Sequence, residues 1–113
     1  QFIDAVFDAY HVYPWIDIPM HFIGGFSIAY TSILFLNFFK EKKIAEINKT
    51  FAIILITISL VALVAVLWEI YEFLVQTFFN VITQPSLEDT ILDFAMGLAG
   101  GLAGAAVFKN VYK

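Results

Sequence analysis

The sequence predicts an all-α integral membrane protein with three transmembrane helices and a short N-terminal interfacial helix. Of its 113 residues, 61% are hydrophobic and only 14% are charged, and phenylalanine alone occurs 13 times. A soluble domain of this size could not bury so much apolar surface, so lipid must act as its solvent. At roughly 20 residues for each crossing, the chain has room for about three spans. We therefore expect residues 1–113 to form a single membrane domain.

Composition also excludes several kinds of site and partner. The chain contains no cysteine, which excludes disulfides, thiolate metal ligands and cysteine nucleophiles. Its net charge is −4, and the absence of a basic patch argues against a nucleic-acid partner. We expect membrane lipid around the protein, and a second copy of the chain or other membrane subunits as its protein partners.

The first hydrophobic segment begins with the signals of a helix start. It predicts a transmembrane helix over residues 18–39, with Asp17 as its cap and Pro19 in its first turn. Before it, residues 1–14 repeat apolar side chains at helical spacing, with aspartates on the opposite face. That pattern favours a short helix lying on the outer membrane surface. We expect His11, within this segment, to contact lipid headgroups rather than a metal.

Two further spans follow. The second is predicted over residues 51–79 and is longer than the roughly 20 residues that the hydrocarbon requires, so it should tilt or emerge from the bilayer. The third is predicted over residues 87–108. Ser86, just before this span, begins a capping-box pattern with Asp89 in its first turn.

The charges are divided between the two ends of these spans. All lysines fall on one side of the topology: Lys40, Lys42, Lys43, Lys49, Lys109 and Lys113. Most acids fall on or near the other side: Asp4, Asp8, Asp17, Glu69, Glu72, Glu88, Asp89 and Asp93. Because lysine-bearing loops stay in the cytoplasm, we expect a multi-pass protein of the cell membrane with its N-terminus outside and its C-terminus cytoplasmic.

Each predicted span carries small and acidic residues on one face. At about 100° per residue, one stripe of the third span contains Asp89, Asp93, Gly97, Gly100 and Gly104. Comparable stripes are Asp17, His21, Gly25, Ile28 and Ser32 on the first span, and Ser59, Ala62, Ala65, Glu69, Glu72 and Gln76 on the second. Two G-xxx-G pairs in the third span permit close approach of another helix backbone, so we expect these faces to look inward.

Six ionisable residues near the outer helix ends are expected to converge in one pocket: Asp17, His21, Glu69, Glu72, Asp89 and Asp93. They carry five negative charges against one imidazole, and no lysine or arginine is placed to neutralise them. Either a bound divalent metal ion or shared protons must balance such a group. Oxygen donors with one imidazole suit Mg²⁺, Mn²⁺, Ca²⁺, Zn²⁺ or Fe²⁺, and the residues alone do not choose among them.

These observations leave the function open between several classes. The first is a binding or accessory scaffold subunit of a membrane assembly, with either a metal ion or shared protons in the cluster. The alternative is a metal-dependent membrane enzyme acting on lipid-linked phosphate substrates at the outer leaflet, for which no catalytic residue is assigned. An ion or proton pathway is least favoured, because the inner halves of the spans offer only a few hydroxyl groups.

Three segments carry a family resemblance: "WIDIPMHFIGGF", "LWEIYEF" and "DTILDFAMGLAGGLAGA". Together they resemble the YjdF-like group of small prokaryotic membrane proteins and, more distantly, the VanZ-like family. The last segment reads Asp93-Phe94-Ala95-Met96-Gly97, whereas VanZ-like proteins usually have an Asn-Thr-x-Gly ending. The resemblance implies a compact multi-span protein whose motif acids cluster, and it implies no reaction.

Overall fold

The computed structural model describes residues 16–81 and 86–113. Its long helices are α2 (Asp17–Glu41), α3 (Thr50–Phe79) and α4 (Leu87–Phe108), and a short 3-10 helix, η2 (Lys109–Val111), follows. Each long helix has the length and apolar composition needed to cross a membrane, and the described residues contain no strand. The prediction of an all-α membrane protein with three spans is confirmed. The expected interfacial helix, at residues 1–14, lies outside the described residues.

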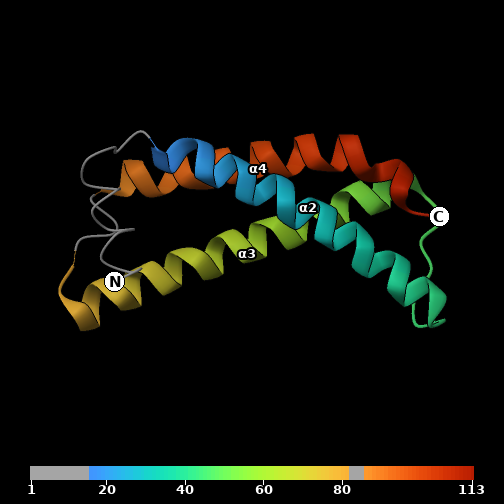
Figure 1. Ribbon diagram of the computed structural model, residues 1–113, viewed down its shortest axis with the longest axis horizontal. Coiled ribbons are helices and arrows are strands. Elements are labelled where there is room, and N and C mark those ends of the chain that lie inside the picture. Colours follow the sequence, from blue (N-terminus) through green and yellow to red (C-terminus); the bar gives the residue numbers. More distant parts are fainter. Residues whose placement is uncertain (1–15, 82–85) are drawn as a thin grey trace.

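The helices form an elongated bundle of 46 × 24 × 23 Å. α2 and α4 run in the same direction and pack side by side over their first halves, while α3 runs the opposite way and crosses α2 in the view of Figure 1. The acidic end of the bundle therefore contains the starts of α2 and α4 and the end of α3. The lysine end contains the end of α2, the start of α3, and η2.

Local signals explain some helix ends and not others. At the start of α4 the Ser86 hydroxyl accepts a hydrogen bond from the Asp89 backbone N–H at 3.1 Å, as the capping pattern predicts. The predicted cap of α2 was wrong: Asp17 is the first helical residue, and the cap position is held by Ile16 without a side-chain hydrogen bond. α3 ends at Asn80, which adopts the left-handed conformation that often terminates helices.

Glycines bring α2 and α4 into backbone contact. A Cβ atom on Gly25 of α2 would collide with the backbone carbonyl of Gly97, and one on Gly100 of α4 would collide with the carbonyl of Phe22. Lipid supplies no hydrophobic drive for helices to associate, so close van der Waals contact at small residues is what holds them. The glycine face predicted for the third span is thus the seam between α2 and α4.

The first half of α3, toward the lysine end, packs through a different face from the one predicted. Its buried residues lie four apart: Ile53, Thr57 and Val61. Ser59, which was expected on the inward face, is exposed. The reason is that α3 crosses its neighbours, and the contact line between crossing helices follows a ridge of residues four apart rather than one straight stripe. Gly101 of α4 leaves room for the Val61 side chain here. A Cβ atom on that glycine would lie 2.8 Å from a Val61 methyl carbon, which is too close.

The apolar core lies toward the lysine end. Ile33 and Leu36 of α2 pack there with Ile53 of α3, and residues after α4 cover them. The acidic end is held by the α2–α4 seam instead, so polar side chains can face one another there.

Candidate functional site

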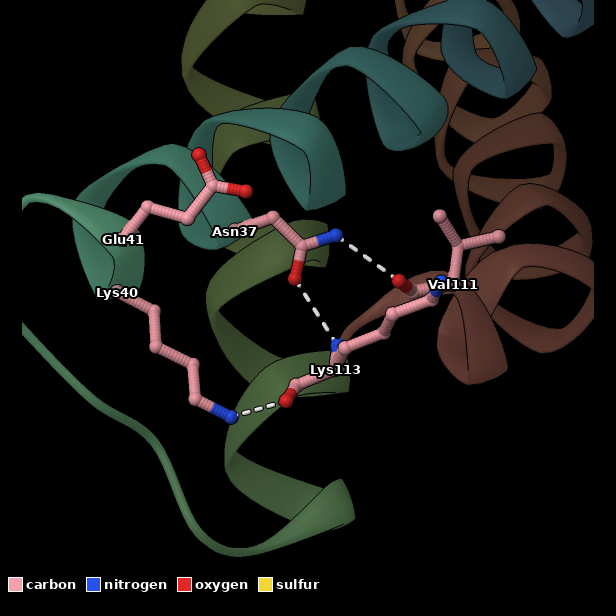
Figure 2. Close-up of a pocket in the computed structure, with 5 residues that line it drawn as sticks. All are labelled: Asn37, Lys40, Glu41, Val111 and Lys113. Carbon is pink, nitrogen blue, oxygen red and sulfur yellow. Dashed lines mark hydrogen bonds between the residues drawn. The ribbon is translucent and has the colours of Figure 1, made fainter.

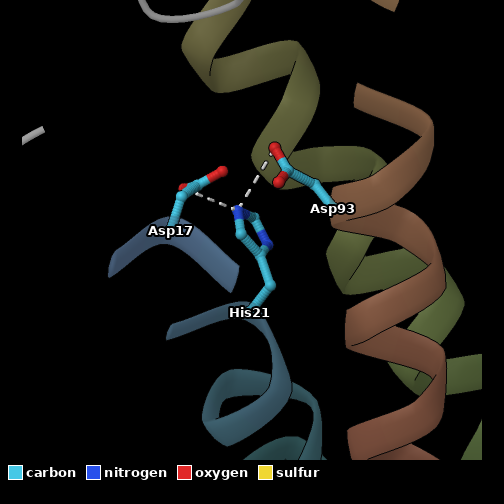
Figure 3. A group of neighbouring side chains, drawn as sticks. All are labelled: Asp17, His21 and Asp93. Carbon is cyan, nitrogen blue, oxygen red and sulfur yellow. Dashed lines mark ion pairs between the residues drawn. The ribbon is translucent and has the colours of Figure 1, made fainter. Parts of the chain in front are cut away.

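The first part of the site pairs α2 with α4. His21 Nε2 lies 3.2 Å from Asp17 Oδ1, one turn earlier on α2, and 3.4 Å from Asp93 Oδ2 on α4. Figure 3 shows the imidazole between the two carboxylates. The Asp93 side chain is only 4% exposed, and those of Asp17 and His21 are 13% and 15% exposed. The imidazole therefore links the two helices at the acidic end.

The second part adds α3. Glu69 and Glu72 lie one turn apart on the inward face of α3, and both are buried. The indole Nε1–H of Trp68 donates a hydrogen bond of 3.1 Å to Glu72 Oε1. The spacing of three residues places both carboxyl groups on the side of α3 that faces α4.

Asp93 belongs to both parts. One ligand atom from each of Asp17, His21 and Asp93 lies within 4.8 Å of the others, and the same holds for Glu69, Glu72 and Asp93. We call these five residues the acid–His cluster. Five of the six residues expected in the pocket thus come together from three helices. Asp89 lies one turn before Asp93, half-buried, and belongs to neither group among the described residues.

The α2–α4 seam sets the position of this cluster. A Cβ atom on Gly25 would collide with the backbone carbonyl oxygen of Gly97, so the two backbones touch one turn below Asp93. With no side chain between the helices at that level, His21 and Asp93 meet directly. The glycines and the ionisable groups therefore form one structural unit.

The spacing along α4 would place Asp93 within the depth of a membrane. The distance along the helix axis from Asp93 to Lys109, the first residue of η2, is about 24 Å at about 1.5 Å per residue. That distance is shorter than the roughly 30 Å of a hydrocarbon core. If Lys109 lies at one boundary of the hydrocarbon core, Asp93 lies inside the core, short of the opposite boundary. Ionisable groups at such a depth are costly and usually serve a function.

Sequence reasoning missed Trp68. This residue lies on α3, and its half-exposed indole packs at a tilt against the Tyr71 ring, with ring centroids 5.4 Å apart, while its N–H donates to the Glu72 carboxylate. A signal was present, because residues four apart on a helix face one another and tryptophan at a membrane boundary usually finds a hydrogen-bond acceptor.

Comparison with known proteins places nearly the whole chain in one family and gives no activity. Neither the curated proteins nor the solved structures contain a match to this sequence. The model of the family described as "Predicted membrane protein (DUF2238)" matches residues 2–113. With three helices able to span a membrane and a family match over nearly its full length, this chain belongs to the DUF2238 family of membrane proteins.

Proposed function

We propose that this protein binds a divalent metal ion in the acid–His cluster between its three membrane helices. The observation that carries the proposal is the group of Glu69, Glu72 and Asp93. Each is at most 7% exposed, and one carboxylate oxygen from each lies within 4.8 Å of the other two. Three carboxyl groups from two helices are thus placed where a single ion could contact all of them.

Electrostatics supports a cation at this point. Two like charges about 4.8 Å apart repel by roughly 3 kcal/mol at an effective dielectric constant near 20. Three such pairs amount to about 10 kcal/mol, which is comparable to the whole stability of a small domain. All six lysines lie at the opposite end of the bundle, and the chain has no arginine. A divalent ion would remove this repulsion.

The surrounding donors suit a hard or borderline metal. His21 and Asp17 form a second ligand group that shares Asp93, so the ion could also draw on an imidazole nitrogen. Carboxylates with one imidazole fit Mg²⁺, Mn²⁺, Ca²⁺, Zn²⁺ or Fe²⁺. The resemblance to YjdF-like and VanZ-like proteins belongs to the same proposal, since their motif acids would occupy these positions.

In this proposal the protein acts as a binding or accessory subunit of a membrane assembly. Its acidic end faces outward, and its partners are a second copy of the chain or other membrane subunits. One observation favours a second candidate, a metal-dependent enzyme acting on lipid-linked phosphate. Asp89 lies beside the cluster but outside both ligand groups, so it would be free of the metal and able to act as a general base.

Metal content tests the proposal. We expect protein purified in detergent without added metal to contain a divalent ion by elemental analysis, or to bind one on titration. Because a ligand that binds only the folded state stabilises it, the ion should add about 3 kcal/mol when its free concentration is 100 times Kd. Chelation should therefore lower the melting temperature, and Glu72→Gln should lower metal content and the response to chelator together.

Glu88→Gln is the matched control, because Glu88 is an exposed acid near the start of α4 outside both ligand groups. It should leave metal content unchanged. If the wild-type protein binds none of the five metals, and Glu72→Gln makes the protein more stable, then protons balance the cluster and the metal proposal is wrong.

A further inference from the structure

A separate cavity opens at the lysine end of the bundle. It has a volume of about 500 Å³ and lies between the end of α2 and the residues that follow α4. Its lining residues are Asn37, Lys40, Glu41, Val111 and Lys113. Figure 2 shows the Lys40 ammonium at the backbone carbonyl of Lys113, with the Glu41 carboxylate pointing away from that ammonium.

The walls of this cavity are held by specific hydrogen bonds. The Asn37 side-chain amide donates to the Val111 carbonyl at 2.9 Å, and its oxygen accepts from the Lys113 backbone N–H at 2.9 Å. The Tyr112 hydroxyl accepts from the Ile47 backbone N–H at 2.9 Å. Residues 111–113 are therefore hydrogen-bonded to α2 on one side and to the segment before α3 on the other.

Lys40 is placed as a fixed charge on this cavity. Its Nζ donates to the backbone carbonyl of Lys113, lies 5.2 Å from the centre of the Tyr112 ring and lies 3.8 Å from Glu46 Oε1. These contacts orient the ammonium, whose three N–H groups can serve more than one acceptor. The side chain is one-third exposed, so a ligand can reach it.

The charge and depth of this end suit an anion carried by the membrane. All six lysines lie here with only two acids, Glu41 and Glu46, so this end has a net charge of 6 − 2 = +4. Lys40 follows the apolar stretch of α2 directly, which places it at the boundary of the hydrocarbon. Phosphate groups of lipids lie at that depth, and lysines near a membrane surface attract anionic lipids.

We propose that this cavity binds the phosphate-bearing headgroup of an anionic phospholipid, with Lys40 and Lys113 as its charged contacts. The site is distinct from the acid–His cluster and lies at the opposite end of the bundle. The lipid's acyl chains would run along the exposed apolar surface of α2, which includes Phe38 and Phe39 just above Lys40.

Native mass spectrometry of the full chain in detergent tests this. We expect phosphatidylglycerol to bind more tightly than phosphatidylcholine with the same acyl chains. Lys40→Gln and Lys113→Gln should each weaken phosphatidylglycerol binding about fivefold, the effect of losing one lysine near an anionic lipid. Lys113→Gln leaves the backbone bonds to Asn37 in place, so it separates lost charge from lost structure.

Two further variants sharpen the result. Lys49→Gln removes a lysine from the same end but outside the cavity, and it should leave binding unchanged. Glu41→Gln removes the one acid of the lining and should tighten binding. Equal affinity for the two lipids, equal losses in Lys49→Gln and Lys113→Gln, or displacement of the lipid by millimolar inorganic phosphate would overturn the proposal.

Discussion

Asp93 is the single residue through which the two halves of the acid–His cluster are joined. Its carboxyl group belongs to the ligand group with His21 and to the ligand group with Glu69 and Glu72. It is also the most deeply buried of these acids, at 4% exposure. Replacement of Asp93 therefore affects both groups, whereas replacement of a residue on α2 or α3 affects one of them.

Trp68 offers a sharper test at the same scale, because it touches the cluster without being a metal ligand. We expect Trp68→Phe to keep the aromatic packing and lose the hydrogen bond to Glu72. Groups that orient metal ligands are worth 10- to 100-fold in affinity, so the variant should bind its metal about tenfold more weakly. The measurement is a metal titration followed by melting temperature.

Tyr71→Phe is the control for that variant. Tyr71 packs against Trp68 but belongs to neither ligand group of the cluster, so losing its hydroxyl should leave metal affinity unchanged. A Trp68→Phe protein that binds metal as well as wild type would show that the indole does not position Glu72.

At the scale of helices, the α2–α4 seam depends on very few atoms. Gly100 packs against the backbone of Phe22, so a Cβ there meets a carbonyl that no side-chain movement can relieve. We expect Gly100→Ala to separate the helices and to cost about 1–3 kcal/mol of stability, the usual range for overpacking. Thermal unfolding in detergent measures it, and the cluster should lose metal affinity in parallel.

Gly97→Ala is the matched variant on the same helix face. A Cβ at Gly97 would meet its nearest neighbour, the His21 carbonyl oxygen, at 3.9 Å, which is ordinary van der Waals contact. Its stability should stay within about 1 kcal/mol of wild type, and alanine's helix propensity acts in its favour. Equal losses at Gly97 and Gly100 would mean that the seam does not have this geometry.

At the scale of the whole molecule, the separation of charge predicts orientation. The lysine end should be cytoplasmic and the acidic end outside, since lysine-bearing loops are retained in the cytoplasm. The chain has no cysteine, so in a single-cysteine variant any thiol labelling of the protein comes from the introduced residue. In intact cells, Ala45→Cys should resist a membrane-impermeant thiol reagent, and Glu88→Cys should react with it. The opposite labelling would reverse the topology and place the acid–His cluster on the cytoplasmic side.

Composition and helical periodicity were enough to predict the class of protein, its three spans and the inward glycine face. These features depend on residues close together in the chain: long apolar runs, a Ser86 cap, and glycines repeating on one face of α4. The gathering of acids at one end follows from where charges interrupt those runs. Such signals are local, so no knowledge of neighbouring helices was needed.

Only the tertiary structure decided which side chains meet. A helical wheel treats each helix as straight and separate, so it placed Ser59 inward, whereas the crossing of α3 buries Thr57 and Val61 instead. The same crossing brings Asp93 against Glu69 and Glu72 on α3 and leaves Asp89, one turn outward, outside the ligand groups. Crossing angle and axial offset arise from backbone contacts between helices, and a pattern read along one helix contains neither.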